Sequence, residues 1–256
     1  MPRRRPQPPK TRPPGLPVGW HLTVYPEARE AVGVFRATSS FQERERVSPG
    51  QSRDPERSRR VASGRAKAKI RRCCVANGLN RLGTLTYEGE GCHDPVQLRA
   101  DLADFFVRLR RLLDGGALPY LWVPEWHHTD HGLHAHFGVG QFVKRSLIEE
   151  AWGRGYVHIK LLGDLPVGST AADEARRAAG YFAKYVGKDV DEDRLGSLHR
   201  YEVAEGFQPR SEKVYGRHLE DAAQLACELI GELPKKQSTS DSWPNWSGPT
   251  AVAMSW

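Results

Sequence analysis

The chain has 256 residues, 39% of them hydrophobic and 27% charged, enough for one large domain or a medium domain with polar extensions. Its net charge of +7 favours an anionic partner, and residues 1–72 hold 18 Lys/Arg against 6 Asp/Glu. Four cysteines without C-x₂-C spacing exclude a zinc ribbon or a disulfide framework. With no signal peptide and no run near the roughly 18 apolar residues of a membrane span, we expect a cytoplasmic protein without membrane contact.

The front of the chain is basic. Residues 1–55 predict a largely disordered arm, because the first 18 residues are rich in proline and arginine. From about Pro55 to Val75 the sequence predicts a basic helix, which Asn77-Gly78 should end. We expect this helix to bind nucleic acid through Arg65, Lys67, Lys69, Arg71 and Arg72. A solubilising or simply disordered tail is the alternative explanation of the basic front.

The middle of the chain carries clear strand and helix periodicities. They predict strands at 82–87, 120–126, 133–139 and 155–162 and helices at 98–113, 144–152 and 171–186. The resulting order, β-α-β-β-α-β-α, predicts an α+β fold with an antiparallel-centred sheet of the split-βαβ, RRM-like or ferredoxin-like kind. Residues 56–190 are therefore assigned to one domain, and 191–256 to a C-terminal helical extension and a flexible polar tail.

The strand at 133–139 bears two histidines. Alternate residues of a strand share a face, so His134 and His136 point together while their apolar neighbours point into a core. Two imidazoles on one rigid strand can grip a divalent metal ion. A third ligand is expected from the preceding strand, and Glu125 is our choice. If the hairpin turns at Asp130-His131, Glu125 lies opposite His136 and His127 opposite His134. Three further histidines compete with Glu125 for this role: His127, His128 and His131.

The helix at 171–186 bears two tyrosines. Residues four apart lie one above the other on a helix, so Tyr181 and Tyr185 present two phenols side by side, with Lys188 about one turn further on and Lys184 beside them. A packed aromatic stripe is the alternative explanation of this spacing. Beside a metal site, however, the pattern indicates metal-assisted attack by tyrosine on a phosphodiester.

Taken in chain order, these motifs resemble those of the HUH endonucleases, the nickases of rolling-circle replication. The strand with Thr84 and Thr86 is similar to the family's first motif, and His134-Ala135-His136 is similar to the second. The third, Tyr181-Phe182-Ala183-Lys184-Tyr185-Val186-Gly187-Lys188, is similar to the two-tyrosine form found in initiators of small phages and plasmids. The resemblance spans roughly residues 60–190.

This resemblance implies a replication initiator that nicks and rejoins single-stranded origin DNA. It implies that the histidines hold Mg²⁺ or Mn²⁺, that a tyrosine forms a 5′-phosphotyrosine and frees a 3′-OH, and that Lys188, with Lys184 as competitor, positions the phosphate. No Walker A loop is present, so we expect a host helicase and the host replication machinery as partners. A transposase or mobilisation relaxase with the same chemistry, or a non-catalytic RRM-like nucleic-acid-binding domain, are the alternatives. The sequence leaves the oligomeric state open.

Overall fold

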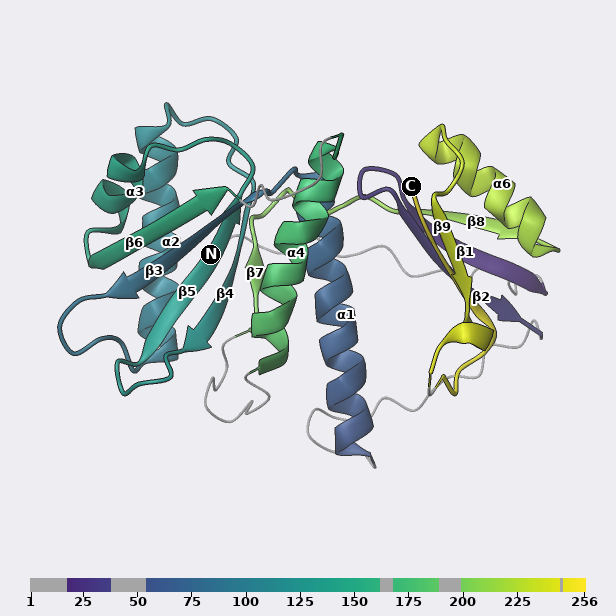
Figure 1. Cartoon of the computed structure of the whole chain (residues 1–256), viewed down its shortest axis with the longest axis horizontal. Coiled ribbons are helices and arrows are strands. Elements are labelled where there is room, and N and C mark those ends of the chain that lie inside the picture. The colour runs from purple at the N-terminus through teal and green to yellow at the C-terminus, as the bar shows by residue number, and fades with distance from the viewer. Residues whose placement is uncertain (1–17, 38–53, 162–167, 189–198, 245) are drawn as a thin grey trace, which may run out of the picture. The chain divides into compact units, whose positions relative to one another are not determined.

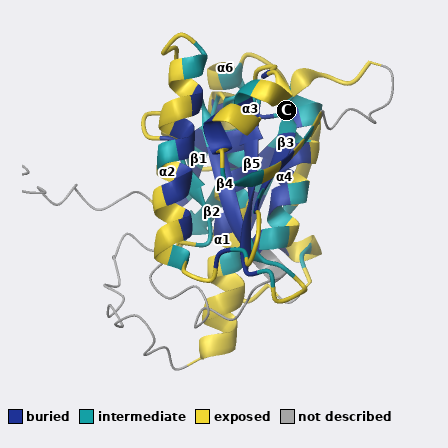
Figure 2. Ribbon diagram, turned by 90° about the vertical axis from the view of Figure 1, so that its left-hand side faces the viewer, coloured by how far each residue is buried: buried dark blue, intermediate teal, exposed yellow. Residues whose placement is uncertain are grey.

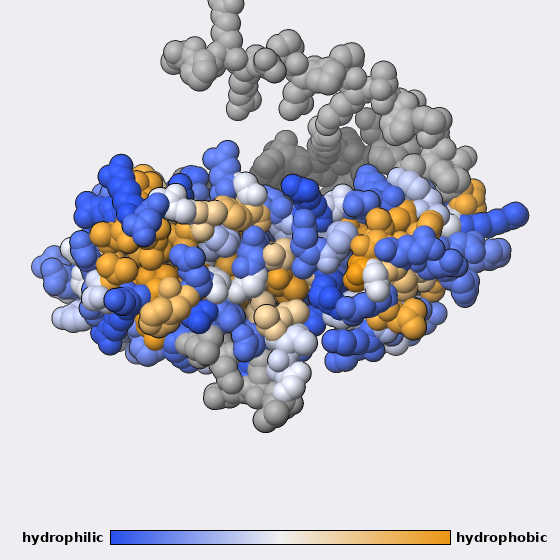
Figure 3. Space-filling view, turned by 90° about the horizontal axis from the view of Figure 1, so that it is seen from above, coloured by the Kyte–Doolittle hydropathy of each residue, from blue (hydrophilic) through white to orange (hydrophobic). Residues whose placement is uncertain are grey.

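The computed structural model describes residues 18–37, 54–161, 168–188, 199–244 and 246–256. The chain divides into two compact units. The larger comprises Tyr25–Arg29 and Ser48–Arg210, and the smaller comprises Met1–Val24, Glu30–Val47 and Ser211–Trp256. Hydrophobic residues form separate patches among hydrophilic ones on the surface seen in Figure 3. No helix in the described ranges is long and apolar enough to cross a membrane.

The larger unit is built on a five-stranded antiparallel sheet with the order β6-β3-β5-β4-β7 (Figure 1). Its elements are α1 (Pro55–Ala76), β3 (Arg81–Tyr87), α2 (Pro95–Leu112), β4 (Tyr120–Trp126), β5 (Leu133–Val139), α3 (Arg145–Trp152), β6 (Gly155–Leu161), α4 (Ala171–Lys188) and β7 (Glu202–Val203). After α1, the order from β3 to α4 is the predicted β-α-β-β-α-β-α. Because β5 inserts between β3 and β4, the sheet is of the predicted split-βαβ kind, and the α+β fold class is confirmed.

Helices cover both faces of this sheet. One face packs against α2 and α3 through a core that includes the odd-numbered residues of β5: Leu133, Ala135, Phe137 and Val139. The opposite face packs against α1 and α4, whose buried residues include Ile70 and Phe182. Figure 2 shows the buried residues on the strands and on the inner sides of the helices. The even-numbered residues of β5 therefore point toward α4, as the strand alternation predicts.

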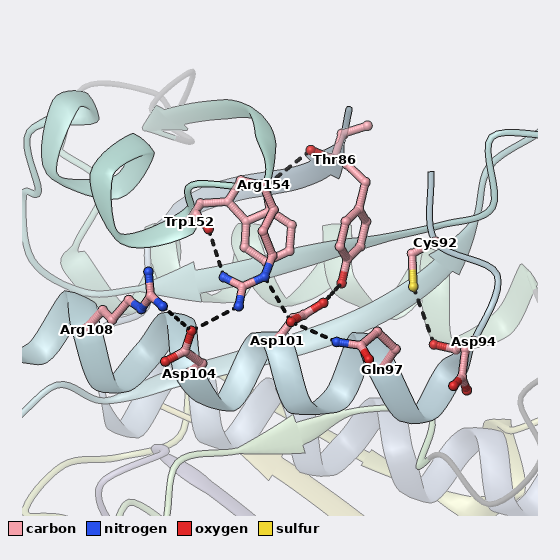
Figure 4. A network of polar contacts seen from close by, with 10 residues as sticks. Thr86, Cys92, Asp94, Gln97, Asp101, Asp104, Arg108, Trp152 and Arg154 are labelled. Atoms are coloured by element: carbon pink, nitrogen blue, oxygen red, sulfur yellow. Dashed lines mark hydrogen bonds and ion pairs between the residues drawn. The ribbon is translucent and has the colours of Figure 1, made fainter. Parts of the chain in front are cut away.

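A polar network ties the α2 side of the sheet together (Figure 4). The buried carboxylate of Asp101 accepts a hydrogen bond of 2.8 Å from the Tyr87 hydroxyl and pairs with Arg154 at 2.9 Å. Arg154 also pairs with Asp104, which Arg108 contacts in turn. Burial first, and then the Asp101 acceptor, raise the pKa of Tyr87, so its phenol remains a donor. This network links β3, α2 and the end of α3, on the face of the sheet away from α4.

The smaller unit holds a second five-stranded sheet, with the order β8-β1-β2-β10-β9. Its elements are β1 (Gly19–Tyr25), β2 (Glu30–Arg36), β8 (Glu212–Gly216), α6 (Leu219–Ile230), β9 (Lys236–Thr239), η1 (Ser240–Ser242) and β10 (Ala251–Ser255). The helix α6 covers one face of this sheet: Ala222 and Ala226 pack against Leu22, Val252 and Met254.

The structure corrects the sequence prediction at both ends of the chain. Residues 19–25 and 30–36, predicted as part of a disordered arm, form β1 and β2. The end of the chain, predicted as a flexible polar tail within residues 191–256, contributes β9 and β10. The physical reason is that β10 pairs with β2, and β8 pairs with β1. Strands near the two ends of the chain therefore satisfy each other's backbone hydrogen bonds in one sheet. Residues 1–17 and 38–53 of the predicted arm lie outside the described residues.

Candidate active site

Three potential metal ligands converge on the face of the larger sheet that carries α4. The Nε2 atoms of His134 and His136 lie 2.9 and 2.7 Å from Oε2 of Glu125 and 3.1 Å from each other. Among the described residues, these three form the group of His, Cys, Asp and Glu side chains able to hold a metal ion. The structure thus brings together the three residues that the sequence selects.

The hairpin register differs from the predicted one by two residues. Glu125 lies opposite His134, and Val123 lies opposite His136. A shift of two residues keeps each side chain on its face, so the cluster survives although its pairing changes. In the actual register His127 donates its backbone N–H to Gly132 at 2.8 Å and closes the loop, so it does not sit opposite His134.

Contacts with the segment between β3 and α2 account for this register. The backbone N–H of Leu133 donates to the carbonyl of Cys92, which forms a bridge with Gly132. Gly132 has a φ of +81°, and a Cβ there would lie 2.1 Å from the Cys92 oxygen. Glycine is therefore required for this close approach. The contact fixes a hairpin loop that is longer than a two-residue turn. The partner in these contacts comes from a distant segment of the chain, so Gly132 alone does not reveal the register.

The three other candidate histidines, His127, His128 and His131, make their closest contacts outside the ligand cluster. Nδ1 of His127 lies 2.7 Å from the Thr129 hydroxyl, and Nε2 of His131 lies 2.7 Å from the backbone oxygen of Tyr87. The ring of His128 packs near that of His127 at a centroid distance of 4.3 Å. All three therefore belong to the loop that closes the hairpin and do not join the ligand cluster.

The electrostatics of the cluster favour an ionised carboxylate. His134 and His136 are only 9% and 6% exposed, and Glu125 is half-buried. Burial raises the pKa of Glu125, but the hydrogen bonds and charges of the two histidines outweigh that effect and hold the pKa well below its usual range. The group therefore presents two ring nitrogens and one negative oxygen toward a common point.

The spacing of the three donor atoms fits a small divalent cation. Adjacent ligands of an octahedral ion at roughly 2.1 Å are separated by about 3.0 Å, and the three measured separations are 2.7, 2.9 and 3.1 Å. Two imidazoles and one carboxylate on one face of a coordination sphere leave the remaining positions open to water or substrate. The residues present thus fit a divalent metal ion with open coordination positions.

Thr84, on the neighbouring strand β3, contacts one of the ligand histidines. It pairs with His136 in the sheet, and its hydroxyl lies 3.1 Å from Nδ1 of that histidine. A contact at the second ring nitrogen fixes the orientation of a ligating imidazole. The sequence identifies Thr84 and Thr86 only through their resemblance to the first motif. The contact itself depends on the β3–β5 register, which short-range patterns do not reveal.

The helix α4 brings a tyrosine onto this cluster. The ring of Tyr185 stacks on that of His136, with centroids 3.8 Å apart and an interplanar angle of 16°. Gly138, two residues beyond His136, permits the approach, because a Cβ there would lie 2.9 Å from the ring of Phe182. Burial, then the charge of Glu125, raises the pKa of Tyr185. The predicted convergence of the histidine strand and the tyrosine helix is present in the structure.

The other residues of the tyrosine helix are arranged around Tyr181. Its ring is half-buried, with Nζ of Lys184 at 4.8 Å and Nζ of Lys160 at 5.0 Å from its centroid. Lys160 comes from β6 and is not anticipated by the sequence patterns. The side chain of Lys188 lies outside the described residues.

A capping box fixes the start of α4. The backbone N–H of Thr170 donates to the Asp173 carboxylate at 3.0 Å, and the backbone N–H of Asp173 donates to the Thr170 hydroxyl. The hydrogen bonds from Thr170 lower the pKa of Asp173 to about 2. This box anchors the first turn of α4, the helix whose second half carries both tyrosines.

Beyond β3, the edge strand β6 leaves polar side chains uncovered beside the cluster. Tyr156, His158 and Lys160 share the face of Thr84 and His136, because His158 pairs with Thr84. All three are exposed, and Tyr156 is 70% exposed. The sequence analysis did not predict this row of exposed polar residues. The row alternates with buried Val157, and this alternation predicts which side chains lie on the face of His136 once that face is known.

The predicted basic residues lie on α1. Arg65, Lys67, Lys69 and Arg71 are exposed, whereas Arg72 is half-buried with its guanidinium 4.0 Å from the ring centroid of Tyr25. The buried side of α1 packs alongside α4 (Figure 1), so the exposed cations project away from that contact.

The fold and the site define a class of protein in which a split-βαβ sheet presents a His-x-His and Glu cluster to a tyrosine-bearing helix. Residues 80–190 match the family model described as replication-associated protein ORF2/G2P. The match begins just before β3 and extends past α4, so it covers the ligand cluster and both tyrosines. It supports a replication initiator family for this part of the chain. No curated protein and no solved structure gives a match.

Proposed function

We propose that this protein is a rolling-circle replication initiator that nicks and rejoins single-stranded origin DNA through a phosphotyrosine intermediate. The observation that carries the proposal is the stacking of Tyr185 on His136, one of three side chains that converge as metal ligands. The family match supports a role in replication over the alternatives of transposition and mobilisation. A non-catalytic RRM-like domain would not need a phenol beside such a cluster.

Glu125, His134 and His136 would hold a divalent cation, Mg²⁺ or Mn²⁺. When bound, such an ion supplies positive charge that stabilises the charge developing on a scissile phosphate. The phenol oxygen of a tyrosine attacks phosphorus, and the bond from phosphorus to the 3′ oxygen breaks. The products are a 5′-phosphotyrosine and a free 3′-OH; the phenol proton is lost to solvent, and the departing oxygen takes up a proton.

We assign the first attack to Tyr185 and the second to Tyr181. Tyr185 contacts the cluster directly, whereas Tyr181 lies one helical turn away beneath two lysines. Lys184 and Lys160 supply positive charge beside Tyr181, which favours a phosphate held there. Lys188 is proposed to position the phosphate, as its place in the tyrosine motif implies.

Single-stranded DNA is the proposed substrate. The exposed row of Tyr156, His158 and Lys160 offers an aromatic ring and a cation beside the cluster, which suits unpaired bases and their phosphates. The exposed cations of α1 supply a further contact to the DNA backbone. A host helicase and host polymerase in the cytoplasm are the proposed partners.

Covalent trapping tests the proposal. Labelled single-stranded origin DNA incubated with the protein and Mn²⁺ should yield an adduct that survives denaturing electrophoresis. Tyr185→Phe keeps the ring that stacks on His136 and removes only the nucleophilic oxygen. Even a misplacement of a reacting group by about 1 Å costs about 100-fold in rate, so loss of the attacking oxygen should lower initial adduct formation at least about 100-fold. Tyr181→Phe should leave the first cleavage within a few-fold and impair the second transfer.

Tyr120→Phe is the matched control, because its ring stacks on Phe106 in the opposite core. Adduct formation that persists unchanged in the Tyr181→Phe, Tyr185→Phe double variant would contradict a tyrosine nucleophile.

A further inference from the structure

The smaller unit presents a sheet face that its own helix does not cover. Leu22 and Val214 face α6, so their neighbours His21, Thr23, Lys213 and Tyr215 point to the other side. His21 pairs with Tyr215, and their rings meet edge to face at a centroid distance of 4.9 Å. This face lies outside the residues that match the replication family.

Two hollows meet at the His21–Tyr215 pair. One, of about 440 Å³, is also lined by Lys213, Trp243 and Trp246. The other, of about 620 Å³, is also lined by Trp20, Phe35, Arg217 and His218. They share the lining residues His21 and Tyr215, and we call the two adjoining hollows together the aromatic groove. The described residues that line it include Lys213, Arg217 and Arg36 and no carboxylate.

The aromatic rings of the groove are held in place yet accessible. The indole N–H of Trp243 donates to the Ser238 hydroxyl at 3.2 Å, and that of Trp246 donates to the backbone oxygen of Pro249 at 2.9 Å. Trp246 is 45% exposed and Tyr215 is 39% exposed. The two indoles also meet edge to face at a centroid distance of 5.2 Å. Rings already fixed in this way can contact a ligand at little entropic cost.

We infer that the aromatic groove is a second binding site for single-stranded DNA. Exposed rings interleaved with cations, in a groove without negative charge, match the two requirements of such a ligand: stacking partners for unpaired bases and neutralisation for its phosphates. Bases within a duplex keep their faces stacked on one another, so the groove selects single strands. The groove belongs to the smaller unit, and DNA binding there does not depend on the nicking activity.

Binding measured in EDTA separates this site from nicking, because the chelator removes any divalent metal. Fluorescence anisotropy of a labelled 20-nucleotide oligothymidylate with the full chain gives the dissociation constant. Trp246→Ala should raise it at least about fivefold, the low end for one base stack. Lys213→Gln should reduce the salt dependence by about one phosphate contact. Phe142→Ala and Lys144→Gln, at exposed positions outside the groove, are the matched controls.

Photocrosslinking locates the contact. With bromodeoxyuridine in the oligonucleotide, crosslinked peptides should contain Tyr215 or the segment from Trp243 to Trp246. Lys213 is exposed, so its variant reports on binding even if Trp246→Ala does not fold. Unchanged dissociation constants together with crosslinks confined to residues 48–210 would overturn the inference. So would equal affinity for duplex DNA, or loss of self-association in Trp246→Ala with unchanged DNA binding, which would identify the groove as a protein interface.

Discussion

Replacing Glu125 by glutamine tests the metal site with the least change in shape. The substitution removes the negative charge and keeps the side-chain size. Loss of a partner that only orients a ligand costs about 10–100-fold in metal affinity, so loss of this directly placed oxygen should cost at least about 100-fold. At a Mn²⁺ concentration of about 100 times the dissociation constant, the wild-type protein gains about 2.7 kcal/mol, whereas the variant gains about 0.4 kcal/mol.

Thermal unfolding with and without Mn²⁺ measures this difference. For a chain of this size, 1 kcal/mol shifts Tm by roughly 2–4 °C, so the wild-type protein should gain about 5–11 °C and Glu125→Gln about 1–2 °C. Glu150→Gln, at an exposed position on α3, should behave as the wild type. Equal Mn²⁺-induced shifts in wild type and Glu125→Gln would refute the assignment of Glu125 as a ligand.

Three further substitutions test how the fold positions the site. Gly138→Ala places a Cβ 2.9 Å from the ring of Phe182, so it should cost about 1–3 kcal/mol in urea unfolding and lower the adduct yield; a variant as stable and active as wild type would contradict the close packing of α4. Asp173→Asn should destabilise the protein by about 1 kcal/mol. Because the folded pKa of Asp173 is lowered to about 2, its contribution is present above about pH 4 and is lost as pH falls through 2, so unfolding curves of wild type and variant should converge there. Asp101→Asn leaves Arg154 without its buried partner and should cost about 2–4 kcal/mol, with wild-type Mn²⁺ affinity retained; reduced Mn²⁺ affinity would contradict a purely structural network.

The local patterns of the sequence predict most of the larger unit. Helical and alternating periodicities locate every element from β3 to α4, since each buries a continuous apolar stripe. The same alternation places His134 and His136 on one face, and helical spacing places Tyr181 and Tyr185 on another. Pro124 predicts an edge or a bulge, and β4 pairs with β7 only at Leu121 and Trp122 among the described residues, so Pro124 needs no partner on that side.

The features that sequence reasoning missed all depend on distant segments. The hairpin register is set by Cys92, which lies before α2. The strands β1 and β10 are short, and their pairing partners lie at the opposite end of the chain. The contacts of Thr84 with His136 and of Lys160 with Tyr181 follow from strand order. The hairpin register, the strand pairs and these side-chain contacts all depend on tertiary pairing, which patterns among neighbouring residues do not encode.

Mass spectrometry of the trapped protein–DNA conjugate tests the central claim most directly. The protein is incubated with single-stranded origin DNA and Mn²⁺, digested, and searched for the peptide that carries a nucleotide. The account predicts a phosphodiester on Tyr185 after the first cleavage, and transfer to Tyr181 once a second cleavage is allowed. A conjugate on a residue outside α4, or cleavage that leaves no covalent intermediate, would contradict it.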